Sequence, residues 1–207
     1  MDVNTIVFDL GGVIINLNVP RCVCNFKRLM PEENIRNILG IDDEGEGVVA
    51  VSTATKQLMH DYEYGNITTD EFLHTLQAYC FEGTTIEQIR EAWLSMLDEL
   101  PQERLDYIAA SRKKGYRTIL LSNSNELHWI PIWEQYHLGD YFDAVFASQY
   151  LHMAKPNKEI FEHVVREAKI DCAHTIYVDD LEKNRKAGKQ FAGWKTVESI
   201  EKLKTEI

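Results

Sequence analysis

The chain has 207 residues, of which 44% are hydrophobic, and its formal net charge is -11. This length accommodates one domain, or one domain that carries a smaller inserted one. The negative charge argues against a nucleic-acid partner, which favours a basic surface. The sequence contains no run of about 18 apolar residues, so we expect no membrane partner. The first residues lack the pattern of a signal peptide, and the four scattered cysteines are typical of free thiols, so we expect a cytoplasmic protein.

Five short apolar runs predict the strands of a buried parallel sheet. They are Thr5–Phe8, Thr118–Leu121, Ala144–Ala147, Thr175–Val178 and Trp194–Val197. Helical patterns lie between the later runs, at residues 101–114, 157–168 and 184–190. Strands that alternate with helices predict an α/β fold with a Rossmann-like, doubly wound parallel sheet.

Residues 9–117 separate the first two predicted strands, although a crossover needs only about 30. The extra stretch predicts helices at 31–39, 52–64, 68–79 and 84–96, with an acidic loop at 40–47. Two of these helices begin with capping-box patterns, Thr68-x-x-Glu71 and Thr84-x-x-Glu87. We therefore expect an α-helical cap over residues 16–82, inserted into a core of residues 1–15 and 83–207. A cap at this point would cover the carboxyl edge of the sheet, where open parallel sheets bind ligands.

Polar residues follow several predicted strands at this edge. Asp9 follows the first strand, Ser122-Asn123 the second and Asp179-Asp180 the fourth, while Lys155 lies after the third. Each has an ordinary explanation alone, as a turn, a helix cap or a solvated lysine. Acids bind a hard cation such as Mg²⁺, and a cation, a lysine and a hydroxyl together bind phosphate. Their joint placement therefore favours a phosphate site that uses magnesium.

Four segments resemble, in order, the motifs of the haloacid dehalogenase (HAD) superfamily. They are Phe8-Asp9-Leu10-Gly11-Gly12-Val13, Leu121-Ser122-Asn123-Ser124-Asn125, Ala154-Lys155-Pro156 and Asp179-Asp180. The resemblance spans nearly the whole chain, and the inserted helices match the small (C1-type) helical cap of that superfamily. The subgroup that the chain resembles most contains bacterial sugar-1-phosphate phosphatases and the N-terminal phosphatase domain of soluble epoxide hydrolases.

This resemblance implies a Mg²⁺-dependent phosphatase in which Asp9 attacks phosphorus and forms an aspartyl-phosphate. It implies that Asp9, Asp180 and the backbone carbonyl of Gly11 bind the metal. Asp179 would be a further ligand, or would orient a water or Lys155. The residues expected to bind the phosphoryl group are Ser122, Asn123 and Lys155.

Position 11 departs from the pattern of the superfamily. Most of its phosphatases carry a second aspartate two residues after the nucleophile, which protonates the leaving group, whereas this chain has Gly11. General acid–base help contributes about 100- to 10,000-fold, so we expect modest turnover or an easily displaced leaving group, such as an anomeric sugar oxygen. His128 is a candidate for the missing acid. Alternatively, His128 is a histidine at a helix start that contacts only backbone or solvent.

The substrate expected from the capped site is a small phosphorylated metabolite that resembles a sugar phosphate, bound by a monomer or a homodimer. One alternative is a catalytically weak, phosphate-binding regulator, and Gly11 is the feature that favours it. A haloacid dehalogenase is a weaker alternative, because such enzymes need no magnesium and lack the paired acids found here at Asp179-Asp180.

Overall fold

The computed structural model describes residues 3–39 and 53–207, with the side chains of 36–39 and 53–56 left aside. A five-stranded parallel sheet has the order β3-β2-β1-β4-β5. Its strands are β1 (Thr5–Phe8), β2 (Arg117–Ser122), β3 (Ala144–Ala147), β4 (Thr175–Val178) and β5 (Lys195–Val197). They confirm the predicted runs to within one residue at each end. The chain leaves β1 toward β2 and β3 and then crosses to β4, so the strand order reverses beside β1.

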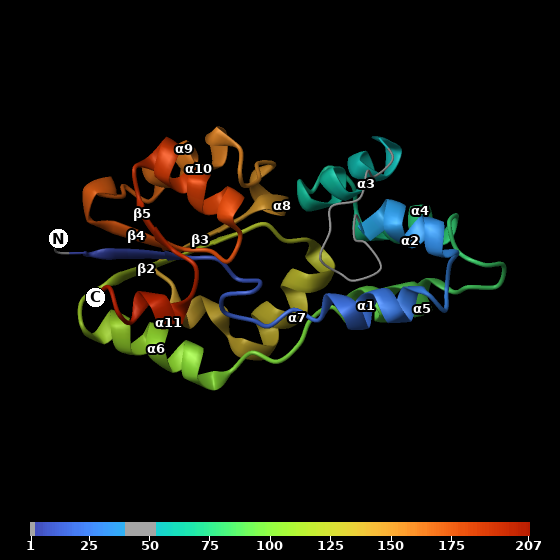
Figure 1. The fold of residues 1–207 in the computed structure, drawn as a ribbon, viewed down its shortest axis with the longest axis horizontal. Coiled ribbons are helices and arrows are strands. Elements are labelled where there is room, and N and C mark those ends of the chain that lie inside the picture. Colours follow the sequence, from blue (N-terminus) through green and yellow to red (C-terminus); the bar gives the residue numbers. More distant parts are fainter. Residues whose placement is uncertain (1–2, 40–52) are drawn as a thin grey trace.

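Helices cover both faces of the sheet, which confirms the doubly wound fold (Figure 1). One face carries α6 (Gln102–Lys113), α7 (Glu126–Tyr136) and α11 (Ile200–Leu203), and the other carries α9 (Lys158–Glu167) and α10 (Glu182–Ala192). Short helices lie at α8 (Ser148–Leu151), η1 (Leu138–Tyr141) and η2 (Cys172–His174). Along β1, Ile6 and Phe8 are buried on the first face and Val7 on the second, as the two-residue period of a strand requires.

A second unit of helices projects beyond the carboxyl ends of the strands, at the right of Figure 1. It contains α1 (Val19–Phe26), α2 (Glu32–Leu39), α3 (Thr53–Glu63), α4 (Thr69–Gln77) and α5 (Ile86–Leu94). Phe26, Phe72 and Trp93 meet edge to face in its own hydrophobic cluster. The acidic loop predicted at 40–47 lies outside the described residues. No helix in the described part of the chain is long and apolar enough to cross a bilayer.

The two predicted capping boxes have different outcomes. Thr68 caps α4 as expected. Its hydroxyl accepts from the Glu71 N–H, and the Glu71 carboxylate accepts from the Thr68 N–H. The box predicted at Thr84-x-x-Glu87 is wrong by one residue. Thr85 caps α5, and the Gln88 side chain accepts from the Thr85 N–H at 2.8 Å. The hydroxyl of Thr84 turns instead toward the carbonyl of Leu29, at 3.4 Å.

The packing of α5 differs from the predicted division of the chain at residue 83. The buried side chains of α5, Ile89, Ala92 and Trp93, belong to the cluster of the helical unit and not to either face of the sheet. We therefore propose to count α5 with this unit, which then extends from residue 16 to about 96. Two linkers at 16–18 and 96–99 join the units and pair with each other through backbone hydrogen bonds.

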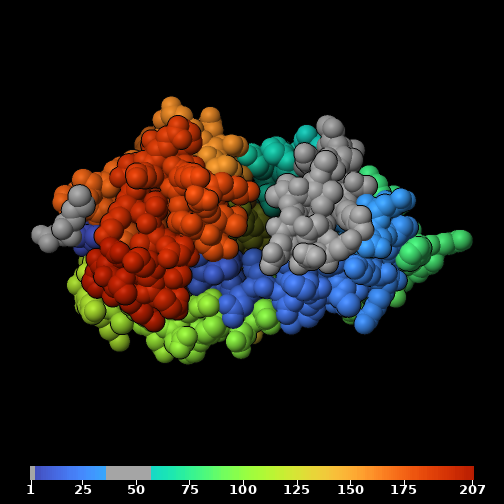
Figure 2. All heavy atoms as spheres, in the orientation of Figure 1, coloured from blue at the N-terminus to red at the C-terminus, as the bar shows by residue number. Residues whose placement is uncertain are grey.

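Arg21 holds the two linkers together. Its guanidinium donates to the carbonyls of Ser95 and Leu97, at 2.7 and 2.6 Å, and lies 3.3 Å from the carboxylate of Asp98. In the space-filling view the blue N-terminal segment runs from the core toward the helical unit (Figure 2).

Candidate active site

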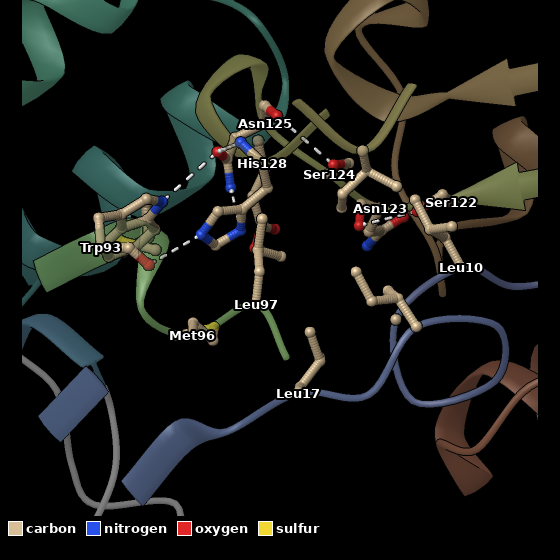
Figure 3. Close-up of a pocket in the computed structure, with 15 residues that line it drawn as sticks. Leu10, Leu17, Trp93, Met96, Leu97, Ser122, Asn123, Ser124, Asn125 and His128 are labelled. Carbon is tan, nitrogen blue, oxygen red and sulfur yellow. Dashed lines mark hydrogen bonds between the residues drawn. The ribbon is translucent and has the colours of Figure 1, made fainter. Parts of the chain in front are cut away.

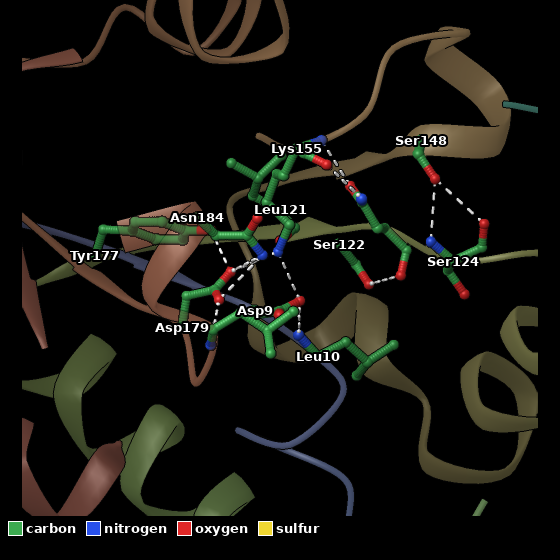
Figure 4. Close-up of polar contacts among 12 residues, drawn as sticks. Asp9, Leu10, Leu121, Ser122, Ser124, Ser148, Lys155, Tyr177, Asp179 and Asn184 are labelled. Carbon is green, nitrogen blue, oxygen red and sulfur yellow. Dashed lines mark hydrogen bonds and ion pairs between the residues drawn. The ribbon is translucent and has the colours of Figure 1, made fainter. Parts of the chain in front are cut away.

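The residues expected at the strand ends come together at the edge of the sheet that faces the helical unit. Asp9 follows β1, Ser122 ends β2 and Asp179 follows β4, the strands that flank the reversal of strand order. Figure 4 shows the side chains of Asp9 and Asp179 converging on Lys155. This edge is the position at which open α/β sheets bind ligands.

Lys155 is the centre of a buried ion cluster. Its Nζ lies 2.9 Å from Oδ1 of Asp9 and 2.7 Å from Oδ2 of Asp179, and it donates to the carbonyl of Leu121 at 3.0 Å. The side chain is 1% exposed. Burial lowers the pKa of Lys155, but the two carboxylates outweigh this effect and hold the pKa above its usual value. The amine therefore stays charged and can neutralise a phosphoryl group.

Asp9 is held as a nucleophile would need to be. Its Oδ1 accepts hydrogen bonds from the Leu10 N–H, at 2.6 Å, and from Lys155, whereas Oδ2 has no donor within residues 3–39 and 53–207. Burial, opposed by Lys155 and reinforced by Asp179, raises the pKa of Asp9 to about 7. A cation beside Asp9 would favour its ionised form.

Asp9, Asp179 and Asp180 each offer a carboxylate oxygen, and these oxygens lie within 4.8 Å of one another. Three carboxylates against one lysine leave an excess of two negative charges. Burial and the charge of Asp179 raise the pKa of Asp180, as this excess requires. Gly12 has φ +74°, and a Cβ there would lie 2.4 Å from Oδ2 of Asp180, so glycine permits this approach. An all-oxygen set with surplus negative charge fits Mg²⁺.

The surroundings of Asp179 distinguish it from the other two acids. Tyr177 donates to its Oδ2, Asn184 donates to both oxygens at 3.1 Å, and the Leu181 N–H donates to Oδ1 at 2.9 Å. Burial alone would raise the pKa of Asp179, but Lys155 and these donors hold it below its usual value. With both oxygens engaged, Asp179 is better placed to orient Lys155 than to bind a cation, while Asp9 and Asp180 retain free oxygens.

Sequence reasoning missed Tyr177 and Asn184. The signal for Tyr177 was its place two residues before Asp179, which puts both side chains on one side of the extended chain. Asn184 lies in the first turn of α10, which begins at Glu182, two residues earlier than predicted. Arg185 of the same helix donates to the backbone carbonyls of Asp179 and Asp180 and so fixes this loop.

In the loop after β2, the predicted phosphate ligand Asn123 also binds the backbone of Lys155. The Asn123 amide donates to the carbonyl of Lys155 and accepts from its N–H, both at 2.8 Å. Its side chain therefore positions Lys155, and since the amide has a second N–H, its role as a phosphate ligand stays a prediction. Ser122 is buried, and its hydroxyl donates only to the carbonyl of Asn123, at 3.2 Å, a bond that it can exchange for a phosphoryl oxygen. Ser148 pins the loop through hydrogen bonds with the Ser124 backbone.

A cavity of about 280 Å³ lies between this edge and the helical unit. Its walls include Leu10, Gly11, Leu17, Met59, Glu63, Met96, Leu97, Ser122, Asn123 and His128. Figure 3 shows the loop after β2 on one side of the cavity, and the linker residues Leu17 and Leu97 below it. The metal role predicted for the Gly11 carbonyl stays a prediction.

His128 lines the cavity but is engaged with the helical unit. Its Nε2 lies 3.1 Å from the carbonyl of Trp93, its Nδ1 lies 3.4 Å from the Asn125 amide, and its ring stacks on Trp93. These contacts fit one neutral tautomer, with the proton on Nε2. Burial lowers the pKa of His128 to about 4. The role of acid for His128 stays a prediction, and these contacts argue against it.

Comparison with known proteins identifies the class. The model of the haloacid dehalogenase-like hydrolase family matches residues 3–192, so the chain belongs to this family of hydrolases. It is similar to the D-ribitol-5-phosphate phosphatase of Bacteroides thetaiotaomicron, with 29% identity over 197 residues, 91% of this chain and 88% of that protein.

Solved structures agree with this assignment. A mutant of the HAD family enzyme bt-2542 from Bacteroides thetaiotaomicron, in complex with magnesium and inorganic phosphate, has a TM-score of 0.78 and 31% identity. The comparison covers 94% of this chain and 93% of that one. A HAD-like family hydrolase from Porphyromonas gingivalis has a TM-score of 0.79 and 28% identity, over 100% of this chain and 98% of that one.

Proposed function

We propose that this protein is a Mg²⁺-dependent phosphatase that hydrolyses a small phosphorylated metabolite, of the sugar or polyol phosphate kind, through an aspartyl-phosphate on Asp9. The observation that carries the proposal is the buried cluster in which Lys155 joins Asp9 to Asp179, beside the free carboxylate of Asp180. The similarity to a phosphatase of a phosphorylated polyol supports the substrate class. The free thiols of the cysteines support a reducing compartment such as the cytoplasm.

The residues present supply the parts of a two-step displacement. The ionised Asp9 attacks phosphorus through Oδ2 while the bond to the leaving oxygen breaks, and water then attacks phosphorus and releases phosphate from Asp9. Lys155 and Ser122 stabilise the charge on the phosphoryl oxygens. Asp9, Asp180 and the Gly11 carbonyl would hold Mg²⁺, which when bound reduces the repulsion between the Asp9 carboxylate and the phosphate.

The cavity favours a small substrate. Its volume of about 280 Å³ and its position under the helical unit suit a metabolite and exclude a folded protein chain. The walls of the cavity also include the apolar side chains of Leu17, Met59 and Leu97. A carbon chain with a terminal phosphate matches this combination of polar and apolar walls.

The alternatives differ from this proposal in their need for metal and turnover. A dehalogenase attacks carbon without magnesium, and so would not use the free carboxylate of Asp180. A phosphate-binding regulator would keep the whole site and lack turnover, and Gly11 remains the feature that favours it.

A screen for phosphate release tests the proposal. The purified chain with Mg²⁺ is given polyol phosphates, sugar phosphates and nucleotides, with Asp9→Asn as the control. We expect release from at least one ester, loss of activity with a chelator, and no activity in the Asp9→Asn variant. Phosphate binding without release from any ester would favour the regulator, and activity that survives the chelator would contradict the metal-dependent mechanism.

A further inference from the structure

The cavity between the sheet edge and the helical unit contains one acidic side chain among its described lining residues, Glu63. This residue ends α3 and comes from the helical unit, whereas the phosphate-binding residues come from the sheet edge. Within residues 3–39 and 53–207, no side chain or backbone group forms a hydrogen bond or an ion pair with the Glu63 carboxyl. A carboxyl that faces a binding cavity without a partner is available to a ligand.

The segment around Glu63 is docked firmly on the core. The Tyr62 hydroxyl accepts from the Leu127 N–H at 3.2 Å, and the Tyr64 hydroxyl accepts from the Asn157 amide at 2.6 Å. Gly65 approaches the core so closely that a Cβ there would lie 2.1 Å from the carbonyl of Gln149. Contacts on both sides of Glu63 therefore fix its backbone relative to the catalytic edge, which is what a group acting on the reaction requires.

The core offers no acid where one would be expected. Gly11 has no side chain, and Leu17 covers it, since a Cβ on Gly11 would lie 3.1 Å from Cδ1 of Leu17. His128, the other titratable residue in the described wall, has both ring nitrogens engaged. Among the described lining residues, Glu63 is therefore the one carboxyl that can meet a leaving oxygen in this cavity.

The environment of Glu63 keeps it protonated to a higher pH than usual. Burial raises the pKa of its carboxyl, and Lys183 on α10 and His60 on α3 oppose this effect without reversing it. The position of Glu63 at the C-terminal end of α3 adds to this, because the negative end of the helix dipole disfavours a carboxylate.

From this geometry we infer that Glu63 is the general acid of the reaction, replacing from the helical unit the side chain that Gly11 lacks. The inference rests on the proposed phosphatase function. As the bond from phosphorus to the ester oxygen breaks, its electron pair stays on that oxygen, which takes the proton of Glu63 and leaves as an alcohol. In the second step the Glu63 carboxylate takes a proton from the water that attacks phosphorus, and so recovers its starting form.

Two esters with different leaving groups test this role in the Mg²⁺-loaded enzyme. An alkyl ester, such as a polyol phosphate, needs protonation of its leaving oxygen, whereas p-nitrophenyl phosphate does not. We expect Glu63→Gln to lower kcat/KM, which reports the departure of the leaving group, by about 100-fold or more for the alkyl ester and by less than about 5-fold for p-nitrophenyl phosphate. Glu82→Gln, at an exposed acid of the same unit, is the matched control and should leave both rates unchanged.

The pH profile and a direct titration provide further readouts. For the alkyl ester, kcat/KM of the wild type should fall as the pH rises through the pKa of Glu63, and Glu63→Gln should lose this limb. In the metal-free protein, ¹³C NMR of the Glu63 carboxyl should give a pKa above 4.5.

The possible failures are distinguishable. An equal loss of kcat/KM for both esters would show that Glu63 binds substrate and is not the acid. A Glu63 pKa of 4.5 or below would also overturn the inference. A wild type that hydrolyses neither ester would overturn the proposed function, and the role of Glu63 with it.

Discussion

Lys155 determines whether the two carboxylates beside it can remain ionised in a buried site. Its replacement by methionine keeps the bulk of the side chain and removes the charge, so that Asp9 and Asp179 face each other without compensation. Loss of one partner from a buried ion pair costs about 3–5 kcal/mol, so we expect Lys155→Met to lower the free energy of unfolding by this amount and to abolish activity. Urea denaturation without Mg²⁺ measures the first effect.

Lys158 provides the matched control for this prediction. It lies 2.9 Å from Glu162, one turn away on the surface of α9, where solvent screens the ion pair and keeps its contribution to stability small. Lys158→Met should therefore change stability little. A Lys155→Met variant that is equally mild would mean that the two carboxylates accommodate each other by taking up protons.

His128 should make the stability of the protein sensitive to acid. Burial lowers the pKa of His128 from 6.5 to about 4, so the unfolded chain takes up a proton first as the pH falls. The stability due to the neutral ring is therefore complete above pH 6.5 and is lost as the pH falls toward 4. Asp9, with its raised pKa, opposes this loss as it takes up a proton, so we expect the wild type to change by about 2 kcal/mol more in the unfavourable direction between pH 7 and pH 5 than His128→Gln does.

Unfolding free energies at the two pH values check this prediction. His74→Gln is the control, because His74 is exposed on α4 and should give the same loss as the wild type. Equal losses in all three proteins would mean that another group controls the acid sensitivity.

The strand-end rule predicted some site residues well and missed others for a physical reason. Parallel strands bring their carboxyl ends to one edge, so Asp9, Lys155 and Asp179 could be placed together from the sequence. The rule positions backbone, not side-chain hydrogen bonds, and so it could not show that the Asn123 amide is occupied by Lys155. Glu63 was beyond its reach, because only the docking of the helical unit brings that residue to the cavity.

The turn between α3 and α4 is the element that depends most on close approach between the units. Gly65 has φ +66°, and an added Cβ would lie 2.1 Å from the Gln149 carbonyl, so Gly65→Ala must push the turn away from α8. Gly83 also has a positive φ, +86°, but nothing lies within 4 Å of an added Cβ. We expect Gly83→Ala to cost about 1–2 kcal/mol for the backbone conformation alone, and Gly65→Ala to cost more.

Thermal unfolding of the two variants measures the difference, and the activity of Gly65→Ala shows whether displacement of the turn disturbs the cavity. If both variants lost the same stability, the close approach of Gly65 to Gln149 would add nothing to the cost of the Gly65→Ala substitution.

Local sequence signals predicted the bounds of the helices and strands better than they predicted how these elements pack. Apolar runs predicted the strands to within one residue, because the central strands β1, β2 and β4 are buried on both faces and read as continuous runs. Adjacent Thr84 and Thr85 offer two capping-box patterns, and only the docking of the Thr84 hydroxyl on Leu29 decides for Thr85. Whether α5 belongs to the sheet core or to the helical unit depends on Trp93, whose partners are distant in sequence.

The molecule carries a net charge of -11, and a local excess of negative charge lies at the proposed metal site, where three acids face one lysine. Folding forces these acids together, and binding of a cation to the folded state alone raises stability by RT ln(1 + [L]/Kd). A saturating excess of Mg²⁺, at about 100 times Kd, should therefore add about 2.7 kcal/mol to the free energy of unfolding.

Asp180→Asn should stabilise the metal-free protein and remove most of the stability gained from Mg²⁺. Burial and the charge of Asp179 raise the pKa of Asp180, so its ionised form destabilises the metal-free fold at pH 8, and removal of that charge should raise the melting temperature without Mg²⁺. The same variant loses a ligand oxygen, so the increment from Mg²⁺ should largely disappear. Asp106→Asn, on the exposed side of α6, should keep the wild-type response. Melting curves with and without Mg²⁺ would contradict the metal site if Asp180→Asn responded as strongly as the wild type, because the variant lacks one of the three clustered carboxylates.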